Sequence, residues 1–103
     1  MNLGLKKKDF ESILAAIKQF PEIEQAIIFG SRALGNYKRG SDVDIAVIGK
    51  MLTDKTITRL SALLNEELPL PYFFDVVRYE KLKNDALKKH IDSKGYVFYE
   101  NGS

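Results

Sequence analysis

Cysteine is absent from the sequence, which excludes disulfide bonds and thiolate-ligated metal sites. No apolar run approaches the roughly 20 residues that a membrane-spanning helix needs, and the N-terminal segment MNLGLKKKDF lacks the apolar centre of a signal peptide. Internal repeats, low-complexity tracts and linkers are also missing. From these absences we expect a cytoplasmic protein in which residues 1–103 form a single domain.

The chain also has no strong excess of positive or negative charge. The chain has 16 Lys and Arg against 14 Asp and Glu, which gives a net charge of +2. This balance is too weak to indicate nucleic-acid binding by itself, and 45% hydrophobic with 29% charged residues is ordinary for a globular domain. The composition therefore favours neither a nucleic acid nor a membrane as partner, and it leaves a homo-oligomer open.

Several familiar catalytic and binding motifs are incomplete. His90 is the single histidine and has no partner at ligand spacing, so we expect it to be structural. The segment GSRALGNY has the glycine spacing of a P-loop, but Asn36 and Tyr37 stand where Lys and Ser or Thr are required. The segment DVDIAV resembles the start of an EF-hand loop, but Val47 replaces its obligatory glycine. Neither motif therefore describes this chain.

Hydrophobic periodicity predicts short strands alternating with helices. Helices are expected at 9–20, 31–34, 52–68 and 82–95, and strands at 25–30, 42–49 and 71–79. The segment 96–100 fits either a last strand or a docking segment. We expect Asp9 to cap the first helix and Asn84 or Asp85 to cap the last. This order predicts an α/β (α+β) fold, a small mixed sheet of about three to four strands backed by helices.

The segment FGSRALGNYKRGSDVDIAV places two carboxylates in an apolar strand. Because side chains alternate along a strand, Asp42 and Asp44 share one face, about 7 Å apart. The other face holds Val43, Ile45 and Val47 and would pack inward. Divalent cations such as Mg²⁺ take carboxylate oxygens, so we predict that the two aspartates bind metal. The alternative is an exposed edge strand that carries charge to prevent pairing.

Asp75 provides a third carboxylate in the apolar segment YFFDVV, where an unpaired charge is costly. If its strand lies beside that of Asp42 and Asp44, the three side chains can hold two metal ions about 3.5–4 Å apart, an arrangement suited to phosphoryl transfer. The alternative is that Asp75 faces solvent or pairs with Arg78.

The Gly30-Ser31 pair suits a phosphate. Glycine lets the backbone approach a ligand closely, and a helix that begins at Ser31 would present free N–H groups to an anion. Arg32, Lys38 and Arg39 could meet further phosphate charge, or they could be solvated loop residues.

Together these positions resemble a known family signature. The pattern G-S-x3-G-x5-S-D-x-D is similar to that of the DNA polymerase β-like nucleotidyltransferase superfamily, and the small size resembles its minimal nucleotidyltransferase (MNT) branch. The resemblance implies that three aspartates are catalytic and bind Mg²⁺ in a two-metal site, the third also helping to activate an acceptor hydroxyl: Asp42, Asp44 and Asp75. It implies that four residues bind the phosphates of the substrate ATP: Gly30, Ser31, Arg32 and Ser41. For Ser41, a turn-forming role in the loop is the alternative.

The resemblance further implies that AMP is transferred from ATP to an acceptor. MNT proteins commonly act as antitoxins against small helical HEPN-domain toxins, some by adenylylating a toxin tyrosine, so a HEPN-type protein is the expected partner. Two alternatives are a binding module that neutralises its partner without transfer, and transfer to a small molecule or RNA. Tyr96, Phe98 and Tyr99 are candidate interface residues, unless they pack on the chain's own sheet.

Overall fold

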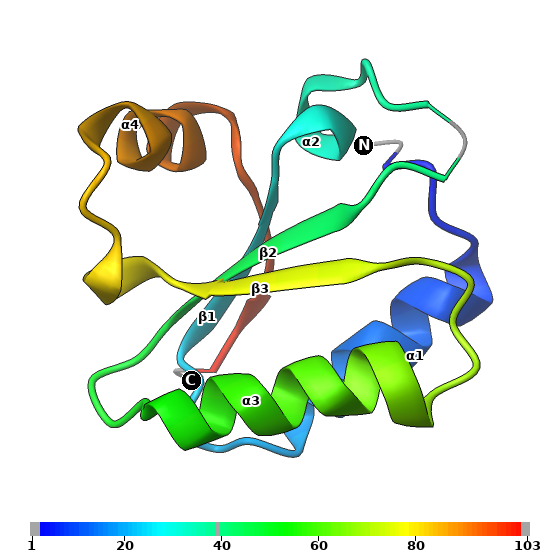
Figure 1. Cartoon of the computed structure of the whole chain (residues 1–103), viewed down its shortest axis with the longest axis horizontal. Coiled ribbons are helices and arrows are strands. Elements are labelled where there is room, and N and C mark those ends of the chain that lie inside the picture. Colours follow the sequence, from blue (N-terminus) through cyan, green and yellow to red (C-terminus); the bar gives the residue numbers. More distant parts are fainter. Residues whose placement is uncertain (1–2, 39, 102–103) are drawn as a thin grey trace.

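The computed structural model describes residues 3–38 and 40–101. Its centre is a sheet of four strands, in the order β3-β2-β1-β4 (Figure 1). The strands are β1 (Gln25–Phe29), β2 (Val43–Ile48), β3 (Phe74–Arg78) and β4 (Tyr96–Glu100). β1 pairs antiparallel with β2 and β4, whereas β2 and β3 are parallel. The expected mixed sheet is confirmed, and the segment 96–100 is one of its two edge strands.

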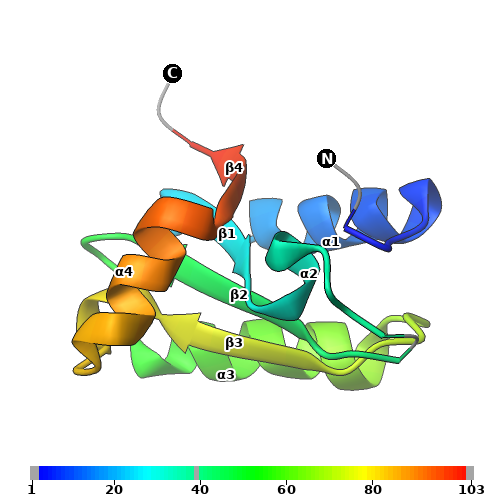
Figure 2. The ribbon, with the colours of Figure 1, turned by 90° about the horizontal axis from the view of Figure 1, so that it is seen from above.

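Helices cover both faces of the sheet (Figure 2). α1 (Lys7–Lys18) and α3 (Asp54–Ala62) pack on one face, and α4 (Asp85–Lys94) packs on the other. The short α2 (Ser31–Leu34) follows β1 as expected and ends at Gly35, whose φ of +81° suits a helix C-cap. Among residues 3–38 and 40–101, no helix is long and apolar enough to cross a membrane.

The alternation of side chains along β2 produces two separate cores. Val43, Ile45 and Val47 are buried in the larger cluster with residues of α1 and α3, as the sequence predicts. Ala46 points the other way and joins a smaller cluster that includes Ile91 of α4. The carboxylate positions of β2 therefore lie on the α4 face, outside the larger core.

Helix capping agrees only partly with the sequence-based prediction. Asn84 caps α4, since its side-chain oxygen accepts a hydrogen bond from the Leu87 N–H at 3.1 Å. The prediction that Asp9 caps the first helix is wrong, because α1 begins at Lys7 and Asp9 lies inside its first turn. The Asp9 carboxylate is 8% exposed and accepts a hydrogen bond from the Tyr72 hydroxyl at 2.9 Å. A tertiary contact therefore occupies the group that would have capped the helix.

The end of α3 continues as a π-helical turn, Leu63–Glu67, that holds the outer edge of β3. Asn65 in this turn accepts a hydrogen bond from the Phe74 N–H at 2.7 Å and donates one to the Phe74 carbonyl at 3.0 Å. Both edge groups of Phe74 are thus satisfied by one side-chain amide, as a neighbouring strand would satisfy them. β3 is thereby fixed between β2 and α3.

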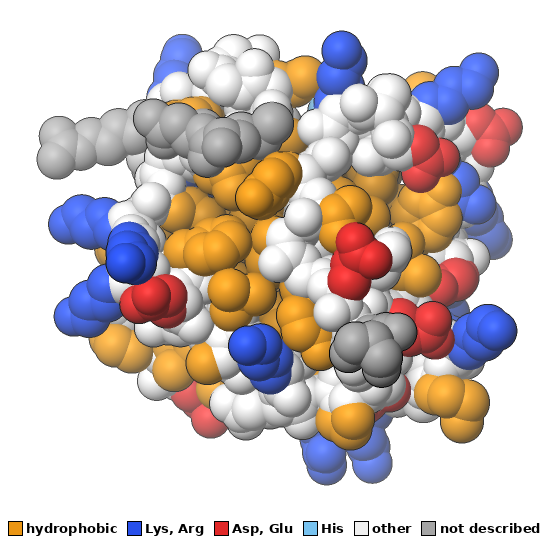
Figure 3. All heavy atoms as spheres, turned by 180° about the vertical axis from the view of Figure 1, so that it is seen from behind, with side chains coloured by type: hydrophobic (Ala, Val, Ile, Leu, Met, Phe, Trp, Pro, Cys, Tyr) orange, Lys and Arg blue, Asp and Glu red, His pale blue; other side chains and the backbone are white. Residues whose placement is uncertain are grey.

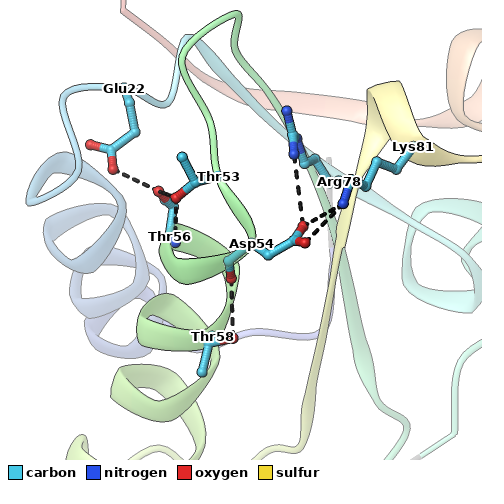
Figure 4. A network of polar contacts seen from close by, with 7 residues as sticks. All are labelled: Glu22, Thr53, Asp54, Thr56, Thr58, Arg78 and Lys81. Carbon is cyan, nitrogen blue, oxygen red and sulfur yellow. Dashed lines mark hydrogen bonds and ion pairs between the residues drawn. The ribbon is translucent and has the colours of Figure 1, made fainter.

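A polar network fastens the beginning of α3 to the end of β3 (Figure 4). Lys81 Nζ lies 2.7 Å from Asp54 Oδ1, and Arg78 Nη1 lies 3.7 Å from the same oxygen. The hydrogen bond from Lys81 holds the pKa of Asp54 below its usual value. Since Asp54 is exposed, we expect this network to orient the helix more than to stabilise the fold.

Substitution of Ile45 tests whether the inward face of β2 is buried as described. Its side chain is 0% exposed, so Ile45→Ala should lower the free energy of unfolding by about 2–5 kcal/mol through lost burial and a cavity. Val97→Ala is the matched control, because Val97 is 42% exposed on β4 and should cost less than about 0.5 kcal/mol. Urea unfolding measures both, and equal losses would contradict the assigned faces.

Candidate functional site

The parallel register of β2 and β3 places Asp44 directly opposite Asp75. Asp42 precedes β2 by one residue and is two positions from Asp44, so it falls on the same face. Asp75 is exposed, and Arg78 pairs with Asp54 rather than with Asp75. The strand pairing on which a three-carboxylate site depends is therefore present.

The side chains, as they stand, do not form a finished metal cage. Within the described part of the chain, no group of three or more His, Cys, Asp or Glu residues is arranged so that it could hold a metal ion. The donor chemistry nevertheless fits a hard cation, because each of the three aspartates offers carboxylate oxygens alone. Metal binding by Asp42, Asp44 and Asp75 therefore stays a prediction.

Burial and neighbouring carboxylates disfavour the charged form of Asp44. Burial raises the pKa of Asp44 above its usual value, and the neighbouring carboxylates of Asp75 and Asp42 raise it further. The positive charge of Arg32 acts on this pKa in the opposite direction. The charged form of Asp44 is therefore disfavoured, and a bound cation would relieve the repulsion.

Gly30 forms the turn between β1 and α2 and touches the carboxylate of Asp44. Its φ of +78° and ψ of −152° lie in a region open essentially only to glycine. A Cβ atom at this position would collide with Asp44 Oδ2. Ser31 then begins α2. The Gly30-Ser31 turn is therefore packed directly on Asp44, one member of the acidic cluster formed by Asp42, Asp44 and Asp75.

His90 contacts the candidate site, which the sequence analysis did not anticipate. Its Nε2 accepts a hydrogen bond from the Gly30 N–H at 2.8 Å, although 60 positions separate the two residues. Its ring also meets Phe29 edge to face, with centroids 6.1 Å apart. The single histidine thus lies at the turn beside Asp44, and a lone residue in a Lys-rich helix gives no sequence signal of this contact.

Arg32 has a different environment from the one predicted. The residue is only 2% exposed, and its guanidinium donates hydrogen bonds to the carbonyls of Leu3 at 3.0 Å and Ser41 at 2.7 Å. The guanidinium carbon also lies 5.2 Å from the ring centres of both Tyr37 and Tyr72. These contacts hold the loop together, and phosphate binding by Arg32 stays a prediction.

Ser41 closes a turn in the loop before β2. Its Oγ accepts a hydrogen bond from the Lys38 N–H at 2.8 Å, and its own N–H donates to the Lys38 carbonyl at 2.9 Å. The turn-forming alternative therefore explains these contacts, and phosphate binding by Ser41 stays a prediction. Lys38 is exposed, and Arg39 lies outside the described residues.

A groove of about 380 Å³ runs along the α3 side of β3, an edge strand of the sheet. It lies between α3 and β3, and Asp75 and the exposed Phe73 are part of its lining. Its α3 side carries small and polar side chains, among them Thr58 and Ser61. Asp42 and Asp44 are not part of this lining.

The C-terminal aromatic residues pack mainly on the chain's own core. Tyr96, Phe98 and Tyr99 are half-buried against the larger cluster, and the Phe98 ring lies 5.7 Å from that of Phe10 in α1. Figure 3 shows the face on which β4 and α1 lie, where hydrophobic side chains gather in the centre and charged ones surround them. The structure therefore supports packing as the first role of these aromatics.

Asp44→Asn tests the repulsion. The pKa of Asp44 is higher in the folded protein than in the unfolded protein. The free energy of unfolding of the wild type therefore falls as pH rises from the unfolded-state pKa to the folded-state pKa. The variant should therefore be more stable than the wild type at pH 7, and this gain should vanish below the unfolded pKa of about 3.9. Thermal unfolding across pH measures the difference. Glu11→Gln on the exposed side of α1 is the control, and a variant less stable at pH 7 would contradict the prediction.

Comparison with known proteins gives a family and a set of similar folds. A sequence model of the family described as "Polymerase beta, Nucleotidyltransferase" matches residues 11–103. No curated protein matches the chain.

Solved toxin–antitoxin complexes contain chains of similar fold. A toxin–antitoxin complex with AMP-PNP matches with a TM-score of 0.71 at 22% identity, over 94% of this chain and 75% of that one. A tri-AMPylated Shewanella oneidensis HEPN toxin in complex with its MNT antitoxin matches with a TM-score of 0.70 at 18% identity, over 94% and 74% of the two chains. The MntA-HepT complex matches with a TM-score of 0.70 at 18% identity, over 93% and 74%. At these identities the likeness is one of fold.

Proposed function

Because the chain belongs to the polymerase beta nucleotidyltransferase family, we propose that it transfers AMP from ATP to a hydroxyl acceptor. The observation that carries the proposal is the pairing of Asp44 with Asp75 on adjacent parallel strands, directly against the Gly30 turn. Carboxylates on two strands and a close backbone turn supply the two halves of a nucleotide site, one for metal and one for phosphate.

In this proposal the three aspartates hold Mg²⁺, which when bound neutralises charge on the transferring phosphate. The raised pKa of Asp44 is compatible with it, since burial and the neighbouring carboxylates disfavour the charged form and a bound cation would favour that form. Gly30 supplies the close turn, and Ser31 supplies a hydroxyl and an N–H for the triphosphate. The amide of Gly30 itself is engaged by His90.

The transfer step needs an acceptor oxygen in line with the leaving pyrophosphate. Asp75, exposed at the edge strand, accepts the proton as the acceptor oxygen bonds to the α-phosphorus. The bond from that phosphorus to the bridging oxygen breaks, and pyrophosphate leaves with the electron pair. Asp75 is also part of the lining of the groove between α3 and β3.

The acceptor in this proposal is a tyrosine of a HEPN-type toxin, which makes the chain an antitoxin. Support comes from the similar folds, one of which belongs to a complex that contains an AMPylated HEPN toxin. The cytoplasm, where ATP is available, is the proposed location.

Intact-mass spectrometry tests the transfer directly. The chain is incubated with Mg²⁺, ATP and the HEPN-type protein encoded beside it, and the partner should gain one or more AMP masses. The Asp42→Asn/Asp44→Asn double variant should give no gain, because two of the carboxylates proposed to bind metal are neutralised. A stable complex without any mass gain would favour neutralisation by binding alone, and an active double variant would overturn the metal-dependent reading.

Asp75→Asn separates nucleotide binding from transfer. Loss of a general base should reduce the transfer rate by about 100-fold or more, while Mg·ATP affinity should change much less because Asp42 and Asp44 remain. Single-turnover rates and calorimetric titration measure the two quantities, with Glu11→Gln as the control. An unchanged rate would show that Asp75 has only a structural role.

A further inference from the structure

We propose that His90 is a positioning residue of the nucleotide site, a role that rests on the proposed function. Its Nε2 lone pair holds the Gly30 amide, and through that amide it fixes the turn before Ser31 against Asp44. His90 itself contacts neither the nucleotide nor the acceptor in this assignment, so its effect passes through the backbone of Gly30.

The contact joins parts of the fold that the sheet alone does not connect. His90 lies on α4, and Gly30 is the first residue after β1. Their hydrogen bond is 2.8 Å long and partly buried. Gly30 has no side chain with which to hold its own conformation, and its φ of +78° is one that it could leave freely in an unrestrained loop. The Leu34 N–H holds the carbonyl of Gly30 at 3.1 Å, and the imidazole restrains its amide.

The ring of His90 is itself held in place. It meets the side chain of Phe29 edge to face, and the next residue along α4, Ile91, is only 2% exposed. Ile91 packs in the smaller core with Phe29 and Ala46. Because α4 is anchored one residue away from His90, the acceptor nitrogen has little freedom to follow a moving turn.

The direction of the hydrogen bond fixes the tautomer. A backbone N–H can only donate, so Nε2 must carry the lone pair and the ring proton must sit on Nδ1. The Gly30 amide is then occupied and cannot also bind phosphate. Gly30 thus contributes shape to the site, and the close approach of its backbone to Asp44 is the feature that His90 preserves.

Two substitutions separate the hydrogen bond from the packing of the ring. His90→Phe keeps an aromatic ring against Phe29 but removes the acceptor. His90→Gln places an amide oxygen near the position of Nε2 but removes the ring. Lys89→Gln, at the exposed neighbour on α4, is the control for the change of residue type.

The first readout is NMR of the chain alone. Long-range ¹H–¹⁵N spectra should show His90 as the Nδ1–H tautomer, and the Gly30 amide proton should shift upfield in His90→Phe but stay near its position in His90→Gln. The Nε2–H tautomer in the wild type would overturn the assignment.

The second readout is calorimetric titration with Mg·ATP. His90→Phe should weaken binding by about 5- to 20-fold, because the backbone of Gly30 would then have to be ordered when the nucleotide binds, and His90→Gln should stay within about 3-fold of the wild type. Equal affinities for His90→Phe and the wild type, or equal losses in both variants, would overturn the inference. A wild type that fails to bind Mg·ATP would instead overturn the proposed nucleotide site itself.

Discussion

The parallel pairing of β2 with β3 sets two carboxylates side by side, and the rest of the site is arranged around their repulsion. Asp44 faces Asp75 across the strands, and burial together with its acidic neighbours raises its pKa. The opposite face of β2 offsets this penalty, because Val43, Ile45 and Val47 are fully buried against α1 and α3. The sheet can therefore tolerate the carboxylate repulsion on its acidic face as long as its apolar face stays buried.

Two cationic or polar groups support the acidic cluster from outside it. Arg32 is buried, joins the N-terminal segment to the loop before β2, and lowers the pKa of Asp44 through its charge. His90 reaches the same region from α4 and binds the Gly30 amide. The loop, the turn and α4 thus meet around one carboxylate, although they are distant in the sequence.

The parts that could be predicted from the sequence are those set by local pattern. The alternation in DVDIAV identified the buried face of β2, and Ser31 and Gly35 marked the bounds of α2. The environment of Arg32 could not be predicted, since loop arginines are usually solvated and its acceptors are distant carbonyls. The contact of His90 with Gly30 spans 60 positions, and no periodicity encodes it. Asp9 does not cap α1, and its carboxylate instead accepts a hydrogen bond from Tyr72, which lies far along the chain.

The amide of Asn65 has a consequence for solubility. β3 is an edge strand beside an exposed phenylalanine, Phe73, and such an edge invites a strand from another molecule. Because Asn65 already occupies the N–H and carbonyl of Phe74, a foreign strand cannot continue the ladder there without first displacing a side chain. The π-helical turn that presents Asn65 thus disfavours aggregation through β3, the strand that carries Asp75. It keeps the backbone of Phe74, next to the exposed carboxylate of Asp75, from taking part in sheet extension.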